Sequence, residues 1–349
     1  MTRTAIAPAA RSFRAHRRAR VRWGIALSAG LAIAVVVIFV LSMSVGSVTV
    51  PPLDVVLATI GSPTEKWHTF IIYELRLPRA ITAVVVGLAL GASGAIFQRL
   101  LRNPLASPDF LGVSSGANVA VVAGFVLWNL TGYQLSTAAI IGGFATAILI
   151  YVLAWRGTVS GYRFILVGIG ISSLMASATS YLLTRATISD AKAAMSWLIG
   201  SVGMAKTSDI IALAVALVLL LPASAFLGKR LRVLELGDGT ATALGARVTL
   251  DRLLLMLAAV ILVALATAAA GPIAFVALMA GPIASRISPR ADESIFRAAC
   301  VGALIVQLSD MTAQHLLATP ISTGIVTGFV GAPYIAWIII RANKSGAAG

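Results

Sequence analysis

The chain has 349 residues, of which 59% are apolar and only 11% are charged, and its formal net charge is +15. A soluble domain carries about 25% charged residues, so this composition excludes one. The single cysteine, Cys300, excludes a disulfide framework, and with three scattered histidines we expect no metal site built by the protein.

Apolar segments long enough to cross a membrane recur along the whole chain. A hydrocarbon core of roughly 30 Å requires about 20 helical residues. The apolar runs are continuous, whereas the strands of a membrane β-barrel alternate apolar and polar residues. We therefore predict an all-α, polytopic membrane protein of about ten transmembrane helices, at 23–45, 78–99, 112–130, 135–155, 164–184, 207–228, 248–270, 272–287, 296–314 and 321–340.

The distribution of basic residues predicts the orientation of these helices. Residues 1–22 form a basic tail with seven arginines and no acid, and an even number of crossings places residues 342–349 on the same side. Twenty-one of the 27 basic residues fall on that side and six on the other. By the positive-inside rule both termini are cytoplasmic, and the net charge reflects topology rather than nucleic-acid binding. We interpret residues 23–341 as one transmembrane domain whose first helix is retained.

Three connections or spans depart from a plain crossing. Residues 46–77 contain three prolines and mixed charges, which indicates an external loop. Residues 189–206 are too short and interrupted to cross, and they favour an interfacial helix with Trp197 at headgroup level. The span 272–287 is short and contains two prolines, which indicates a broken or tilted helix.

Motifs for catalysis are absent from the sequence. There is no GxxxxGK[ST] loop to cradle a nucleotide phosphate and no HExxH zinc motif, so we do not expect an enzyme. Nearly all of the twelve acidic residues lie in connections, and only Asp310 lies in or near the end of a span. Asp310 is either an ion-coupling residue of a secondary transporter or a hydrogen-bonded acid at a helix end.

The segment 229–247 (KRLRVLELGDGTATALGAR) is the longest connection between crossings on the tail side. Asp238 is predicted to cap a short helix that runs through Leu244, and Gly245 to end it. Such a compact unit is suited to docking on a motor protein, and a solvated loop is the alternative.

Two spans carry small or polar side chains on a helix face. In the second span, Gly87, Gly91 and Gly94 predict close helix packing. In the fifth span, serine and threonine residues either line a polar path or hydrogen-bond neighbouring helices; the candidates are Ser172, Ser173, Thr179 and Ser180.

Three stretches carry a family resemblance that covers nearly the whole chain. They are LRLPRAITAVVVGLALGASGAIFQRLLRNPLASPDFLGVSSGA at 75–117, GPIAFVALMAG at 271–281 and GIVTGFVGAPYIAW at 324–337. The chain resembles the FecCD family, the permease subunits of ABC importers for ferric siderophores, haem and cobalamin. It departs from the family pattern at 281–285, at Gln314 and at 320–322. Gln314 replaces an external arginine, which puts one docking contact in doubt.

The resemblance implies roles for individual residues. Arg76 and Arg79 would pair with glutamates of an external substrate-binding protein. Asn103 and Leu105 would form part of the cytoplasmic gate, and the fifth helix would border the transport path. Residues of segment 229–247 would contact an ATPase: Leu236, Gly237, Asp238, Ala243, Leu244 and Gly245.

The resemblance also implies an assembly in the bacterial cytoplasmic (inner) membrane. A second permease, identical or paralogous, would complete the path, and two ATPase subunits would hold ATP and Mg²⁺. This chain would bind no cofactor of its own. Ferric siderophore is the expected cargo, with haem or cobalamin as alternatives. An ion-coupled secondary transporter is the remaining alternative and would require Asp310.

Overall fold

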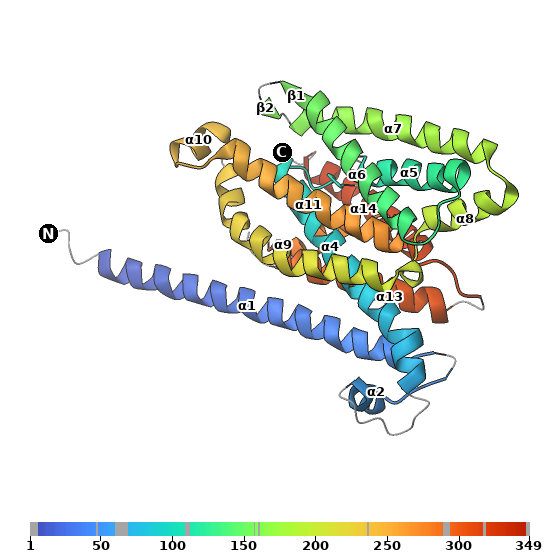
Figure 1. The fold of residues 1–349 in the computed structure, drawn as a ribbon. Helices are drawn as coiled ribbons and strands as arrows, with labels where there is room; N and C mark the ends of the chain where they lie inside the picture. The colour runs from blue at the N-terminus through green and yellow to red at the C-terminus, as the bar shows by residue number, and fades with distance from the viewer. Residues whose placement is uncertain are drawn as a thin grey trace.

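The computed structural model describes residues 6–46, 48–59, 69–108, 112–156, 158–159, 161–235, 237–288, 294–316 and 319–346. Nearly all of these residues are helical (Figure 1). The long helices are α1 (Ile6–Ser44), α4 (Leu77–Leu100), α6 (Tyr133–Ala154), α7 (Gly161–Arg185), α9 (Thr207–Leu234), α11 (Val248–Ala270), α13 (Ile295–His315) and α14 (Thr323–Gly346). The shorter ones are α2 (Pro52–Thr59), α5 (Val113–Trp128), α8 (Ile188–Ile199), α10 (Asp238–Ala243) and α12 (Val276–Ile287).

Short elements complete the chain. A π-helical turn, η1 (Ile71–Arg76), leads into α4, and a 3-10 turn, η2 (Val202–Met204), precedes α9. A two-residue hairpin of β1 (Trp155–Arg156) and β2 (Thr158–Val159), paired antiparallel, joins α6 to α7.

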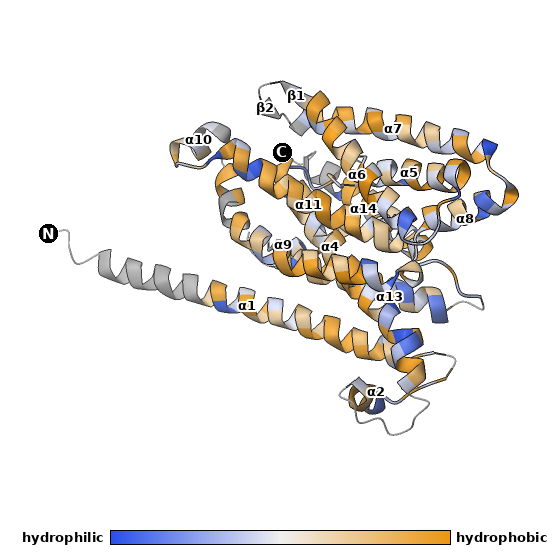
Figure 2. Ribbon diagram, in the orientation of Figure 1, coloured by the Kyte–Doolittle hydropathy of each residue, from blue (hydrophilic) through white to orange (hydrophobic). Residues whose placement is uncertain are grey.

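The predicted all-α membrane fold is confirmed. Among the described residues, eight helices are long and apolar enough to cross a membrane, and α5 and α12 are shorter apolar helices. Each of the ten predicted spans therefore falls on a helix. Figure 2 shows hydrophobic residues along the helices and hydrophilic ones mainly near their ends. We call the end with the start of α1, α10 and the end of α14 the tail end, and the opposite end, with α2 and η2, the loop end (Figure 1).

Helix α4 forms the centre of the bundle, where it packs against α9, α11, α12 and α13. The predicted close packing of its glycine face is confirmed. A methyl group on Gly87, Gly91 or Gly94 would overlap backbone atoms of α13 or α12. Helices α1 and α7 lie at the periphery, with few of their residues buried.

Three predicted segments differ in detail in the structure: the loop 46–77, the basic tail 1–22 and the span 272–287. The external loop 46–77 contains α2 and the η1 turn, because Pro52 occupies the first helical position, where its missing N–H is no loss. Helix α1 begins at Ile6, so part of the basic tail continues the first helix. The short span 272–287 is helical only from Val276. Phe275, the residue before it, lies in the left-handed region at φ 68°.

The short helix predicted at 189–206 is present but ends earlier. α8 ends at Ile199, because Gly200 adopts φ +74° against the backbone of Pro272. Trp197 is buried beside Val121, Ala139 and Ala268 rather than exposed, because α8 packs back onto α5.

Candidate functional site

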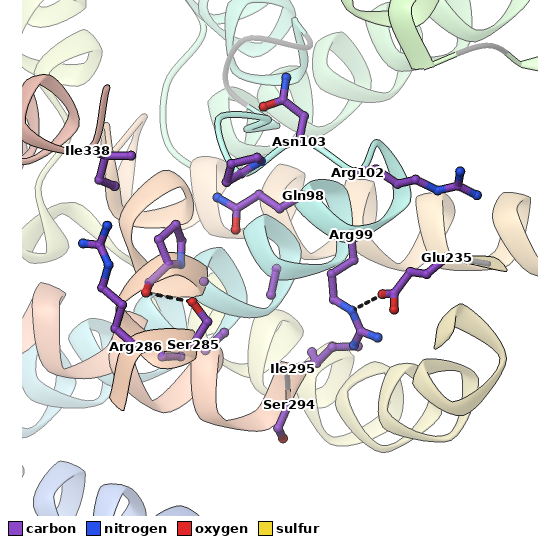
Figure 3. A pocket seen from close by; sticks show the side chains of 16 residues that line it. Gln98, Arg99, Arg102, Asn103, Glu235, Ser285, Arg286, Ser294, Ile295 and Ile338 are labelled. Carbon is purple, nitrogen blue, oxygen red and sulfur yellow. Dashed lines mark hydrogen bonds and ion pairs between the residues drawn. The ribbon is translucent and has the colours of Figure 1, made fainter. Parts of the chain in front are cut away.

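The tail end contains a cavity of about 690 Å³ between the end of α4, the end of α9, and α12 to α14 (Figure 3). Its wall carries three arginines, Arg99, Arg102 and Arg286, and the acid Glu235. The predicted gate residue Asn103 also lines it. The cavity therefore has a basic surface and is formed by segments far apart in the sequence.

Two contacts join the end of α4 to the end of α9. Arg99 Nε donates to Glu235 Oε1 at 2.8 Å, and Arg102 Nη2 donates to the carbonyl of Leu234. Leu234 is buried in the main core, whereas the Glu235 side chain is 36% exposed. The end of α4 and the turn after it are thus linked to Leu234 and Glu235, which directly precede Leu236, the first predicted ATPase contact.

The turn after α4 has a defined geometry. The amide of Asn103 donates to Gln98 O at 3.0 Å, and that of Arg102 to Arg99 O at 3.2 Å, which together form a Schellman motif. Arg102 occupies the left-handed position at φ 49°, where glycine is usual. The Asn103 side chain accepts from the amide of Leu105 at 2.9 Å, so it stabilises the next turn.

Helix α12 closes the other side of the cavity. Gln98 is buried and donates to the carbonyl of Leu278 at 3.0 Å, and Gly281 lies directly against its side-chain oxygen. The guanidinium of Arg286 lies 4.4 Å from the ring centre of Trp337, which is a cation–π contact between α12 and α14. These contacts attach both helices to the end of α4.

The predicted coupling segment forms a helix–turn unit at the tail end. The amide of Gly245 donates to Thr242 O and that of Ala246 to Ala241 O, so the predicted helix end at Gly245 is confirmed. Ala241 is buried against the core, whereas Leu244 is 64% exposed. Ala243 is also exposed. The unit is therefore anchored on one side and open on the other.

The start of this helix differs from the prediction. Gly237 is the residue that precedes α10, with φ 107°, and Asp238 is the first helical residue rather than the cap. Only glycine adopts such a φ readily, and this sets the start of the helix. Leu236 lies outside the described residues.

At the loop end, Arg76 holds the segment that follows α1. Its Nη1 donates to Met43 O at 2.6 Å, and its Nη2 donates to Val48 O at 2.5 Å. Gly46 lies against the guanidinium. The structure thus places Arg76 at the end expected for an external docking residue and gives it contacts within the chain.

Arg79, one turn further along, is paired with Asp310 of α13. Its Nε and Nη2 donate to the two carboxylate oxygens at 2.8 and 2.7 Å. Thr323 Oγ1 donates to Asp310 Oδ1 at 2.8 Å, which adds α14 to the pair. Asp310 is therefore a hydrogen-bonded acid near the end of its helix, the second of the two alternatives given for it. The docking roles of Arg76 and Arg79 stay predictions.

The four polar candidates of α7 divide between two faces. Ser173 and Ser180, seven residues apart, are exposed, whereas Thr179 is buried and Ser172 is half-buried near the start of α5. Ser173 and Thr179 each donate to the carbonyl four residues earlier in α7. Of the four, Ser173 and Ser180 are the ones open to a path or a partner outside this chain.

Sequence reasoning missed the residues that join these elements: Gln98, Arg99, Glu235 and Arg286. Arg99 and Glu235 are separated by 136 residues. The only signal in the sequence was their position: Gln98, Arg99 and Arg286 lie at the tail-side ends of predicted spans, and Glu235 lies in the connection 229–247.

The bundle of span-length apolar helices, with its anchored unit at the tail end, defines a multi-pass membrane protein. The comparisons with known proteins agree with this class. The FecCD transport family model matches residues 33–341. The ferric enterobactin transport system permease protein FepG of Escherichia coli (strain K12) is 40% identical over 303 residues, which cover 86% of this chain and 91% of FepG.

Two further comparisons extend this result. The achromobactin transport system permease protein CbrC of Dickeya dadantii (strain 3937) is 37% identical, over 88% of this chain and 89% of CbrC. A solved inward-facing structure of a metal-chelate type ABC transporter superposes with a TM-score of 0.79 at 26% identity, over 90% of this chain and 98% of that one. The chain belongs to the FecCD transport family and is the permease type of subunit found in ABC importers.

Proposed function

We propose that this permease carries ferric siderophore across the bacterial cytoplasmic membrane, with its tail end in the cytoplasm. The main support for coupling between an ATPase and the gate is the pair of contacts from Arg99 and Arg102 to the end of α9. Through these contacts, a movement of α10 reaches the turn that contains Asn103. An ATPase bound to α10 would in this way move the gate turn without touching it.

The partners follow from the exposed surfaces. One of two ATPase subunits, which hold ATP and Mg²⁺, would bind the open side of α10 around Leu244, which is 64% exposed, and the other would bind the second permease. A second permease, identical or paralogous, would face the exposed side of α7, where Ser173 and Ser180 would line the path. An external binding protein would dock at the loop end near Arg76 and Arg79. This chain would bind no cofactor itself.

The proposal for the cargo rests on relatives named for ferric enterobactin and achromobactin transport. The pairing of Asp310 with Arg79 argues against ion coupling through this residue, because both of its carboxylate oxygens already accept hydrogen bonds from Arg79 and Thr323. Energy would then come from ATP hydrolysis by the partner subunits.

The coupling proposal is tested by Leu244→Glu. We expect this variant to insert normally but to lose co-purification with the ATPase and to lose uptake, because a charge would enter an apolar contact. Leu53→Glu is the matched control, since Leu53 is 69% exposed on α2 at the opposite end. It should keep the ATPase bound. Full uptake by Leu244→Glu would contradict the coupling role.

The cargo is tested in a deletion strain that is supplied with one iron source at a time. Restored uptake of radioactive ferric enterobactin by the reintroduced gene is the expected result. Restored uptake of haem or cobalamin alone would contradict the siderophore assignment and leave the coupling proposal intact. Purified alone in vesicles, the chain should accumulate nothing, even under an ion gradient.

A further inference from the structure

A second tail-end cavity lies between α1, α9 and α13, on the outside of the bundle. Its volume is about 470 Å³. Figure 1 shows α1 diverging from the bundle toward its tail end, so this cavity opens between α1 and its neighbours. The residues that matter for its chemistry are Val21, Ala29, Ala32, Ala225, Gly228 and Arg297.

The depth of the cavity in a membrane follows from the helix ends. Val21 begins one candidate span, Gly228 ends another, and Arg297 lies in the first turn of a third. All three therefore lie near the tail-side membrane boundary. From Val21 to Ala32 the wall extends about 16 Å toward the membrane centre, at 1.5 Å per helical residue. The cavity thus begins at headgroup level and continues into the hydrocarbon.

Its wall is charged at the boundary and apolar below. The Arg297 side chain lines the cavity although the residue is only 2% exposed, and its Nη1 lies 3.4 Å from Gly24 O. Arg99 also lines it, paired with Glu235. Deeper in the membrane the wall consists mainly of alanines, including Ala29, Ala32 and Ala225, and the hydroxyl of Ser28 donates to Gly24 O. Water is a poor occupant of the deeper part of this space, because a mainly apolar wall offers it few hydrogen bonds.

We propose that this cavity binds one anionic phospholipid, with its phosphate beside Arg297 and an acyl chain along the alanines of α1 and α9. A guanidinium forms strong charge-assisted hydrogen bonds with phosphate oxygens, and basic pockets between membrane helices on the cytoplasmic side favour anionic headgroups. The lipid fills the space between α1 and the bundle, and so stabilises the position of α1. This inference does not depend on the cargo or the coupling.

The test measures lipid binding to the purified full chain in neutral detergent. We titrate phosphatidylglycerol, phosphatidylcholine or inorganic phosphate and record bound mass by native mass spectrometry and the thermal unfolding temperature. Phosphatidylglycerol should bind one to one and raise the unfolding temperature. Phosphatidylcholine and inorganic phosphate should do neither. Equal effects of the two lipids, or stabilisation by phosphate alone, would overturn the proposal.

Variants locate the site. Ala29→Phe places a ring in the apolar part of the cavity and should abolish the bound phosphatidylglycerol. Val36→Phe is the matched control, since Val36 is a 60% exposed position of α1 outside the cavity, and it should bind normally. Arg297→Gln should weaken binding about fivefold, as expected for the loss of one cation. Unchanged binding by Ala29→Phe would overturn the proposal even if Arg297→Gln failed to fold.

Discussion

The two ends of α4 each carry an arginine paired with an acid from another helix, but the two pairs differ in their surroundings. At the loop end, Arg79 and Asp310 form a bidentate pair with Thr323 as a third member, and their side chains are 28% and 12% exposed. At the tail end, Arg99 Nε donates to one oxygen of Glu235, and the two side chains are 8% and 36% exposed. The loop end of α4 is therefore the more firmly held, and the tail end is better suited to movement.

The largest expected effect is that of Asp310→Ala. Removing the acid leaves the Arg79 guanidinium without its bidentate partner in a mostly enclosed position, which should cost about 3 kcal/mol of unfolding free energy. Thermal or denaturant unfolding in detergent measures this. Glu74→Ala is the control, because Glu74 is an exposed acid at the same end, and it should change stability by less than about 0.5 kcal/mol.

A double variant sharpens this prediction. Arg79→Ala combined with Asp310→Ala should be less destabilised than the sum of the two single variants, because each single change leaves a charge behind. Additive losses would show that the two side chains act independently, and the loop end would then not be held by this pair.

An intermediate effect is expected for Asn103→Ala at the tail end. The variant loses the hydrogen bond from the amide of Leu105, which should cost about 1 kcal/mol. Asn103→Asp keeps the acceptor and should recover most of the stability. If both variants were equally destabilised, the side-chain acceptor would not be what stabilises the turn.

The smallest effect on stability is expected for Glu235→Ala. An ion pair with one partner more than a third exposed contributes little, so the loss should be about 0.5 kcal/mol. Uptake should nevertheless fall, since the contact joins α4 to the segment before α10. Uptake by Asp310→Ala, measured at a temperature at which that variant is folded, provides the comparison. Wild-type uptake by Glu235→Ala would show that this contact does not transmit movement of α10 to the turn that contains Asn103.

The predictable features were those set by local sequence. The ten apolar segments fall on helices because the length of an apolar run alone decides whether a helix can cross a bilayer. The glycine face of α4 and the helix end at Gly245 were predictable for a similar reason, since glycine alone allows the required approach or φ angle. The family resemblance gave roles to residues in these segments, and those roles stay predictions.

The remaining features depend on which helices become neighbours. Arg79 and Asp310 are separated by 231 residues, and nothing in either local sequence specifies that they meet. The same is true of Trp197, an expected interfacial residue that becomes buried because α8 packs onto α5. The sequence by itself determined the ten apolar segments and their helical type, because these follow from local apolarity and backbone preference. Only the tertiary structure decided which charges are paired and which surfaces stay open, because both depend on the packing of distant segments.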